Sequence, residues 1–298
     1  MRGIDLIAFD LDGTVFGIPF RQEVSSRVLR AFERAHAQGV TIVVATGRPD
    51  WMLGEQLPRA TWLDWRILAN GSRVKPSRGD DAGLSLPIPR PAALELVGRL
   101  DTLGAALNLH TGSASYVERR KTEIYAEEQR RAALAGKLPP EVMEEIGEPR
   151  TLNPIDAALR IGGMTVVDSG LETMSRNPAL ELFKVDCTLP DPQAADEATS
   201  ELAGLGGIEI ARLGPTELEI SRAGVSKGEG LGWLCDHLGI DESRAVAFGD
   251  SGNDLSMAGR TATFVAMGNA SDKVKAAADE ITDDVLHDGV ATWIEARL

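Results

Sequence analysis

Residues 6–16 read LIAFDLDGTVF and join a short apolar run to a turn that holds two carboxylates. The run at 6–9 predicts a buried strand, and Asp10 and Asp12 follow directly after it. An Asp-Gly pair after a strand indicates by itself no more than a turn. The function of Asp10 and Asp12 therefore depends on which other residues the fold places beside them.

Apolar runs of the same kind recur in both terminal parts of the chain. Further strands are predicted at 40–49, 67–69, 245–250 and 262–269. Helical patterns lie between and after them, at 24–39, 226–239, 272–278 and 289–298. Near-continuous apolar strands separated by helices predict a parallel sheet covered on both faces, which is a doubly wound α/β fold.

The middle of the chain has a different pattern, in which apolar and polar residues alternate. This alternation is typical of strands with one solvent-exposed face, and such strands are predicted at 106–110, 115–119, 179–185 and 207–213. Helical patterns lie at 91–103, 123–135 and 192–205. We therefore expect a discontinuous α/β domain, 1–84 and 217–298, that carries an inserted α+β domain, 85–216.

Composition narrows the range of partners. The 298 residues are 43% hydrophobic and 26% charged, with a net charge of −14, so nucleic acid is an unfavourable partner. No apolar run approaches the roughly 18 residues of a membrane span, and Asp5 and Asp10 interrupt any signal sequence. Cys187 and Cys235 have no metal-ligand spacing. We expect a cytoplasmic protein, as a monomer or small homo-oligomer.

Four polar clusters lie at or near the ends of the predicted α/β strands. They are Asp10-x-Asp12-Gly13-Thr14, Thr46-Gly47-Arg48, Lys227, and Gly249-Asp250-Ser251-Gly252-Asn253-Asp254. The carboxyl ends of parallel strands meet at one edge of the sheet, so the clusters are expected to converge. Carboxylates without histidine or thiolate suit Mg²⁺, whereas a hydroxyl, backbone amides and a lysine suit a phosphoryl group. The combination predicts Mg²⁺-assisted phosphoryl transfer.

The order and content of these clusters resemble the haloacid dehalogenase (HAD) superfamily, whose nucleophile motif is DxDGT. Stretches that resemble its Cof-like, type IIB phosphatase branch lie at 224–234, 247–257, 265–270 and 287–294. The resemblance implies a Rossmann-like HAD core with an inserted C2-type cap. It also implies a Mg²⁺-dependent phosphatase of small phosphomonoesters, with sugar phosphates as the expected substrates and an aspartyl-phosphate intermediate.

The resemblance also implies roles for the acids. Asp10 would be the nucleophile, and Asp12 would protonate the leaving oxygen and then activate water. Mg²⁺ would be held by a side-chain oxygen of Asp10, the backbone carbonyl of Asp12 and the side chain of Asp250. Asp254 would either orient metal-bound water or ligate the ion directly.

The remaining roles concern the phosphoryl group. Thr46, the amide of Gly47 and Lys227 would hold its oxygens, and Lys227 would also offset repulsion between the substrate and Asp10. Asn253 would contact the phosphoryl group or orient Lys227. Arg48 would reach the substrate or pair with a surface acid.

Some conspicuous residues outside these clusters are interpreted as structural. The basic stretch 119–121 is expected in a solvated loop, with an anion site as the weaker alternative. His110, His237 and His287 have no metal-partner spacing.

Two other functions stay open at this point. A phosphomannomutase-like isomerase shares DxDGT and the cap type, and a non-catalytic regulator could use the same fold. Phosphate release from p-nitrophenyl phosphate would separate the phosphatase from the regulator, and bisphosphate dependence without phosphate release would identify the isomerase. A dehalogenase is disfavoured because Asp12 is present, an acid that those relatives lack.

Overall fold

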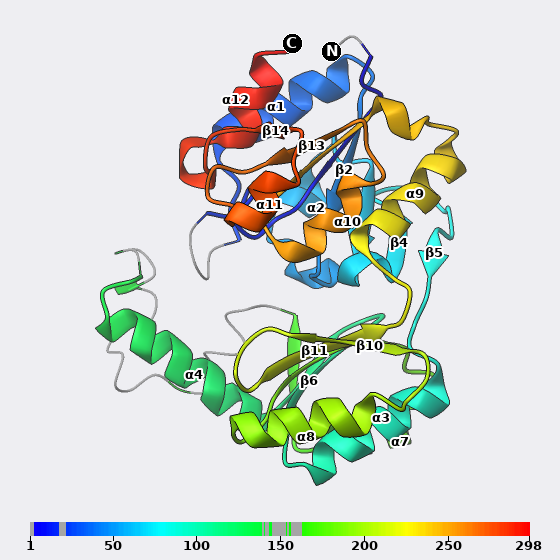
Figure 1. Cartoon of the computed structure of the whole chain (residues 1–298), viewed down its shortest axis with the longest axis vertical. Coiled ribbons are helices and arrows are strands. Elements are labelled where there is room, and N and C mark those ends of the chain that lie inside the picture. Colours follow the sequence, from blue (N-terminus) through cyan, green and yellow to red (C-terminus); the bar gives the residue numbers. More distant parts are fainter. Residues whose placement is uncertain are drawn as a thin grey trace. The chain divides into compact units, whose positions relative to one another are not determined.

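The computed structural model divides into two compact units, Met1–Ser85 with Val225–Leu298, and Leu86–Gly224 (Figure 1). It describes residues 3–17, 22–138, 140, 143–144, 153, 155 and 163–298. The other residues between 139 and 162, which belong to the predicted inserted domain, therefore lie outside the described part of the chain.

The first unit is built on an eight-stranded sheet of order β14-β13-β12-β1-β2-β3-β4-β5. Its strands are β1 (Leu6–Phe9), β2 (Thr41–Ala45), β3 (Trp65–Leu68), β4 (Arg73–Pro76), β5 (Leu84–Ser85), β12 (Ala245–Gly249), β13 (Thr263–Ala266) and β14 (Glu280–Ile281). Pairing is parallel from β14 to β3, and β4 and β5 join antiparallel. The predicted parallel sheet is confirmed, with an antiparallel edge that the sequence patterns did not reveal.

Helices cover both faces of this sheet. They are α1 (Ser26–Ala37), α2 (Gln56–Arg59), α9 (Lys227–Leu238), α10 (Leu255–Ala258), α11 (Asp272–Ala276) and α12 (Gly289–Glu295). Short 3₁₀ turns are η1 (Asp50–Met52), η2 (Ala69–Gly71), η4 (Glu242–Arg244), η5 (Gly252–Asp254) and η6 (Val285–His287). As predicted, Ser226 caps the start of α9 through the amide of Glu229, and Gly239 ends it with φ of 68°.

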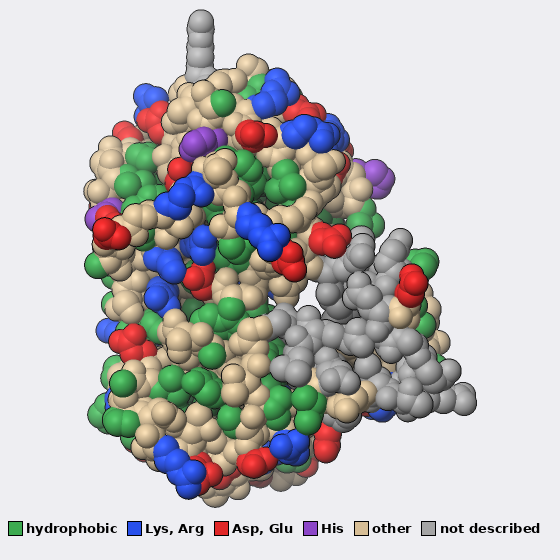
Figure 2. All heavy atoms as spheres, turned by 180° about the vertical axis from the view of Figure 1, so that it is seen from behind, with side chains coloured by type: hydrophobic (Ala, Val, Ile, Leu, Met, Phe, Trp, Pro, Cys, Tyr) green, Lys and Arg blue, Asp and Glu red, His purple; other side chains and the backbone are tan. Residues whose placement is uncertain are grey.

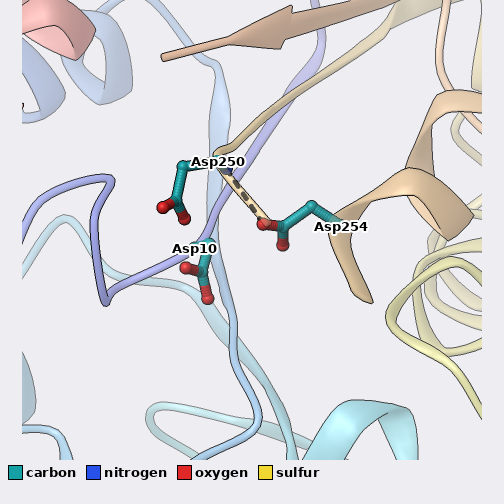
Figure 3. Close-up of side chains that lie close together, drawn as sticks. All are labelled: Asp10, Asp250 and Asp254. Carbon is teal, nitrogen blue, oxygen red and sulfur yellow. Dashed lines mark hydrogen bonds between the residues drawn. The ribbon is translucent and has the colours of Figure 1, made fainter. Parts of the chain in front are cut away.

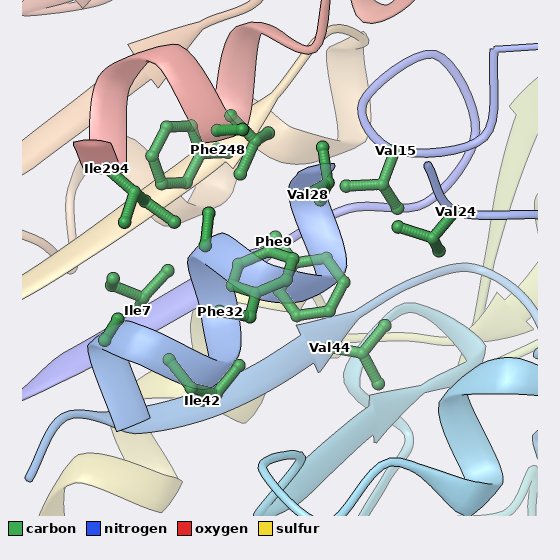
Figure 4. Packing of buried hydrophobic residues seen from close by; sticks show 14 of the residues in the cluster. Ile7, Phe9, Val15, Val24, Val28, Phe32, Ile42, Val44, Phe248 and Ile294 are labelled. Carbon is green, nitrogen blue, oxygen red and sulfur yellow. The ribbon is translucent and has the colours of Figure 1, made fainter. Parts of the chain in front are cut away.

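The two-sided cover explains why the central strands β1, β2 and β12 are almost entirely apolar. Ile7 and Phe9 of β1 point into the core beside α1 and α12, whereas Leu6 and Ala8 point into the core beside α9. Figure 4 shows the first of these cores, in which the rings of Phe9 and Phe32 stack at 4.3 Å between centroids. A strand buried on both faces cannot alternate with polar residues.

The second unit contains a six-stranded sheet of order β10-β11-β9-β6-β7-β8, antiparallel except between β7 and β8. Its strands are β6 (Ala106–Thr111), β7 (Ser115–Glu118), β8 (Met164–Val167), β9 (Leu182–Thr188), β10 (Ile208–Arg212) and β11 (Glu217–Arg222). Its helices are α3 (Arg90–Thr102), α4 (Arg119–Leu134), α7 (Gly170–Arg176) and α8 (Pro192–Leu202). Apolar residues from alternate positions of these strands pack with α3, α7 and α8 in a separate core.

Two features of this unit differ from the sequence-based expectation. The exit from the inserted domain was expected at 217, but β11 begins there and pairs with β9 and β10, so the unit extends to Gly224. The basic stretch 119–121 was expected in a loop, but it forms the first turn of α4.

On the face drawn in Figure 2, acidic and basic side chains are interspersed. Among the described residues, no helix combines the length and the apolar character needed to cross a membrane.

Candidate active site

Three neighbouring parallel strands end at the same edge of the sheet, and a polar cluster follows each of them. Asp10 follows β1, Thr46 follows β2 and Asp250 follows β12, and these strands lie in the order β12-β1-β2. The cluster residues therefore leave the sheet at the carboxyl ends of adjacent strands, where α/β proteins place their ligands.

Three carboxylates converge at this edge (Figure 3). Asp10, Asp250 and Asp254 each offer an oxygen, and these oxygens lie within 4.8 Å of one another. Asp10 and Asp254 are buried, with 4% and 0% of their surface exposed. Lys227, also buried, donates hydrogen bonds from Nζ to Asp10 Oδ1 at 2.5 Å and to Asp254 Oδ1 at 2.7 Å.

Burial governs the protonation of this cluster. It raises the pKa of Asp10 to about 7, because the nearby Lys227 offsets only part of the desolvation and Asp254 adds repulsion. Burial likewise raises the pKa of Asp250 to about 6, helped by the charge of Asp254. Burial would lower the pKa of the Lys227 ammonium, but the carboxylates of Asp10 and Asp254 outweigh it and raise that pKa.

The cluster suits a divalent cation. One ammonium faces three carboxylates, and Asp250 Oδ1 is buried without a hydrogen-bond partner among the described residues. A buried carboxylate oxygen without a donor is costly unless a cation meets it. Oxygen donors of this kind fit Mg²⁺ better than a soft transition metal.

Both carboxylate oxygens of Asp254 accept hydrogen bonds from other groups of the chain. Its Oδ2 accepts hydrogen bonds from the backbone amides of Asp250 and Ser251, each at 3.0 Å, while Oδ1 accepts from Lys227. This arrangement closes the loop after β12 and orients the lysine. Direct ligation of a metal by Asp254 would compete with these bonds.

The turn after β1 is shaped by close contacts. Gly13 has φ of +79°, and a Cβ there would lie 2.2 Å from Asp250 Oδ2. Its carbonyl accepts a hydrogen bond from Asn269 Nδ2 at 2.8 Å. Asn269 belongs to the VAMGNA stretch, whose function the sequence alone did not indicate. The asparagine thus ties the loop after β13 to the turn that carries Asp12.

Asp12 lies apart from the buried carboxylates. Its side chain is 60% exposed, and both of its oxygens accept from Arg48, Oδ2 from Nε at 2.7 Å and Oδ1 from Nη2 at 2.6 Å. Arg48 also donates to the backbone carbonyl of Met52. Of the two roles predicted for Arg48, the structure contains the pairing with an acid.

The loop after β2 is partly buried and is held by its neighbours. Thr46 is 1% exposed, and its Oγ1 accepts a hydrogen bond from the amide of Arg48 at 3.1 Å. Gly47 lies against Asn70, whose Oδ1 would be 3.0 Å from a Cβ at that glycine. Asn253 donates from Nδ2 to the same Asn70 oxygen at 3.1 Å. Asn70, which belongs to none of the predicted clusters, thus joins two of them.

The conspicuous residues of the second unit form separate contacts. His110 Nε2 lies 2.6 Å from Asp186 Oδ2, and its Nδ1 lies 2.8 Å from Ser115 Oγ. In the stretch 119–121, Arg119 and Arg120 pair with neighbouring acids, and Lys121 is buried against Thr188. The expectation of a loop was therefore wrong, because these residues begin a helix, and solvation holds for Arg119 but not for the buried Lys121.

The chain is similar to known hydrolases and phosphatases over nearly its whole length. A family model described as haloacid dehalogenase-like hydrolase matches residues 7–150 and 167–294. A 5-amino-6-(5-phospho-D-ribitylamino)uracil phosphatase of Bacillus subtilis is 26% identical, covering 98% of this chain and 94% of that protein. A pyridoxal phosphate phosphatase of Escherichia coli is 28% identical and covers 98% of both chains. A solved haloacid dehalogenase-like hydrolase from Bacteroides thetaiotaomicron superposes with a TM-score of 0.76 at 25% identity, over 99% of this chain and 100% of that one.

Proposed function

The chain belongs to the family of haloacid dehalogenase-like hydrolases, and from that premise we propose that it hydrolyses small phosphomonoesters with Asp10 as nucleophile and Mg²⁺ as cofactor. The observation that carries the proposal is the buried contact of Lys227 with Asp10 and Asp254 at the end of β1. A lysine in that position favours the ionised nucleophile and faces an incoming phosphoryl anion.

The chemical steps are assigned to two acids. One oxygen of Asp10 attacks phosphorus, the bond to the ester oxygen breaks, and an aspartyl-phosphate forms. Asp12 donates a proton to the leaving oxygen and then takes one from the water that hydrolyses the aspartyl-phosphate. The Asp12 side chain is exposed, so it is accessible to the leaving oxygen of a bound ester.

The metal would be held by the Asp10 and Asp250 side chains and the backbone carbonyl of Asp12. When bound, Mg²⁺ supplies positive charge to the phosphoryl oxygens. We assign Asp254 to a positioning role, because its oxygens already accept from Lys227 and from the loop amides.

The phosphoryl group would be held by Thr46, the amide of Gly47, Lys227 and Asn253. Each is a hydrogen-bond donor, so together they suit a phosphate dianion rather than a neutral ligand. For Asn253 this favours contact with the phosphoryl group over orientation of Lys227, whose ammonium is already held by two carboxylates.

The substrate class follows from the relatives together with the resemblance. Two relatives that span nearly the whole chain are named for a phosphoribityl compound and for pyridoxal phosphate, both small phosphorylated metabolites. We propose that this chain acts on the same broad class, sugar phosphates included.

The test is phosphate release from p-nitrophenyl phosphate and from a panel of phosphorylated metabolites, with Mg²⁺ and after chelation. We expect activity that requires the metal. Asp10→Asn should lower kcat by roughly a thousand-fold or more, because an amide is a poor nucleophile. Asp236→Asn, at an exposed position of α9, is the matched control. Full activity without a divalent metal, or near-normal turnover by Asp10→Asn, would contradict the proposal.

A further inference from the structure

The turn after β3 joins three parts of the candidate active site. The amide of Ala69 donates to the carbonyl of Arg48, and the amide of Asn70 donates to the carbonyl of Thr46, each at 3.1 Å. On its other side the turn packs against the start of α9, where a Cβ at Gly71 would lie 2.0 Å from the carbonyl oxygen of Ser226. The turn therefore fixes the loop after β2 relative to the helix that begins at Lys227.

The backbone of this turn is unusual for its side chains. Ala69 and Asn70 have φ of 47° and 55°, in the left-handed region that residues other than glycine seldom adopt. Asparagine is among the residues that tolerate this region best. Left-handed residues that persist in a buried turn occur frequently at functional sites, and Asn70 is 9% exposed.

The Asn70 carboxamide determines how Asn253 is oriented. Asn70 Oδ1 accepts from Asn253 Nδ2 at 3.1 Å, while Asn253 Oδ1 accepts from Ser251 Oγ at 2.6 Å. The amide is thus held at both ends, and its nitrogen cannot exchange places with its oxygen without losing the bond to Asn70, whose Oδ1 can only accept. One N–H of Asn253 Nδ2 is left without a partner among the residues that the structure describes.

We propose that Asn70 is a positioning residue for phosphoryl binding, which holds the Asn253 carboxamide so that its remaining N–H is offered to a phosphoryl oxygen. Two requirements coincide at this position, namely a backbone in the left-handed region and a side-chain acceptor, and asparagine meets both. The inference rests on the proposed function, because it assumes that a phosphoryl group binds beside Gly47 and Asn253.

The test is the dissociation constant for inorganic phosphate, measured by calorimetry on the whole chain in the presence of Mg²⁺. Asn70→Gly keeps the left-handed backbone without strain and removes the acceptor, so the variant is expected to fold. We expect its dissociation constant to rise about ten-fold, as for loss of one hydrogen bond to a charged group. Asp288→Gly, a left-handed residue at the start of α12, is the matched control and should bind phosphate as the wild type does.

A double-mutant cycle separates positioning from a general effect on the turn. If Asn70 acts through Asn253, then Asn70→Gly in an Asn253→Ala background should change phosphate affinity by less than about two-fold. The proposal would be overturned if the fold-losses of phosphate affinity in the two single variants multiply in the double variant. It would also be overturned if Asn70→Gly binds phosphate with wild-type affinity.

Asn253→Ala alone is the second variant, because Asn253 is exposed and its removal leaves the core intact. Unchanged phosphate affinity in this variant would also overturn the inference, since the oriented amide would then bind nothing. Failure of the proposed function would instead appear as a wild-type chain that binds phosphate but hydrolyses no phosphomonoester.

Discussion

Arg48 is the residue whose contacts bear most directly on proton transfer. Its guanidinium donates to both oxygens of Asp12 and is itself anchored on the carbonyl of Met52. A two-pronged contact fixes the plane of a carboxylate as well as its position. If Asp12 is the acid that protonates the leaving oxygen, Arg48 determines where that proton is presented.

Arg48→Lys should therefore affect substrates unequally. Lysine keeps the charge but cannot form two parallel hydrogen bonds. An alkyl phosphate needs a proton on its leaving oxygen, whereas p-nitrophenolate is a weak base and leaves without one. We expect kcat for an alkyl phosphate to fall about ten-fold more than kcat for p-nitrophenyl phosphate, as for a partial loss of general acid catalysis.

The control is Arg27→Lys, since Arg27 pairs with Glu295 at the surface through Nε and Nη2, which both donate to Oε2. This variant should leave both rates unchanged. Equal losses for the two esters in Arg48→Lys would mean that Arg48 does not act through Asp12.

Gly13 offers a test of how closely the turn fits Asp250. Gly13→Ala would place a methyl group 2.2 Å from Asp250 Oδ2 and force alanine to φ of +79°. We expect kcat/KM to fall about a hundred-fold, as for a displacement of about 1 Å at a reacting centre. Gly39→Ala has a similar φ of +88° with open space around it, so it should lose about 1–2 kcal/mol of stability and no activity. Comparable activity of the two variants would contradict this account.

At the residue scale, the sequence predicts which residues are polar and where their strands end, but not their contacts. Asp10, Asp250 and Lys227 could be grouped because each lies at or near the end of a predicted strand or the start of a predicted helix. The hydrogen bond between Asn70 and Asn253 joins residues 183 positions apart in the sequence, and no local sequence pattern indicates it. For the same reason, pairing of Arg48 with an acid was one of two open alternatives, and the sequence did not indicate Asp12 as the partner.

At the scale of elements, Asp50 connects three secondary-structure elements beside the candidate active site. It lies in η1 and accepts from Arg66 of β3 at 2.7 Å and from Lys75 of β4 at 2.8 Å. The Arg66 side chain is only 9% exposed, so it depends on this partner. Burial alone would raise the pKa of Asp50, but the hydrogen bonds from Lys75 and Arg66 outweigh it and lower that pKa.

The stabilisation by Asp50 should consequently depend on pH. A folded-state pKa below the unfolded value gives stability that is present above the unfolded pKa of about 3.9 and is lost as pH falls through the folded one. We expect Asp50→Asn to cost about 1–3 kcal/mol at pH 7, by urea unfolding, and progressively less below about pH 4. Asp5→Asn, which breaks an exposed pair with Arg244, should cost less than about 1 kcal/mol. A pH-independent loss in Asp50→Asn would show that charge is not the cause.

Elements were predicted well where they are buried on both faces and less well elsewhere. The strands β1, β2 and β12 are almost entirely apolar and are followed by glycine turns, so the sequence predicted their positions. The helix α4 begins at Arg119, four residues before its predicted start, because its first turn is basic and carries no capping side chain. The strand β11 was not predicted, because the Gly-Pro turn at 214–215 was interpreted as the end of the inserted domain.

On the scale of the whole molecule, the two units carry different chemistry. The first contains all the residues proposed to bind the phosphoryl group and the metal, and we assign none of its described residues to recognition of the rest of a substrate. The six-stranded sheet of the second unit has an apolar face toward α3, α7 and α8, and a charged cluster on its other face. In that cluster Lys184 lies 2.8 Å from Glu219 and 3.2 Å from Asp186, and Asp186 also contacts His110.

Buried charge of this kind costs desolvation, so it often indicates a requirement other than stability. Burial would raise the pKa of Asp186, but Lys184 and His110 outweigh it and lower that pKa, which favours a permanently charged cluster. Charged groups held in fixed positions can distinguish one polar leaving group from another. We therefore expect the second unit, and this cluster in particular, to determine which phosphomonoester is preferred.

The expectation is tested by replacing Leu86–Gly224 with the corresponding segment of a related phosphatase that has a different substrate. The ranking of metabolite phosphates should change toward that relative, while hydrolysis of p-nitrophenyl phosphate persists because its chemistry uses only the first unit. A narrower probe is Glu219→Gln, which leaves Lys184 with one ion-pair partner fewer. It should change kcat/KM for metabolites at least ten-fold more than for p-nitrophenyl phosphate, whereas Glu181→Gln, at an exposed position before β9, should change neither. A chimera that keeps the original ranking would mean that the first unit itself recognises the leaving group.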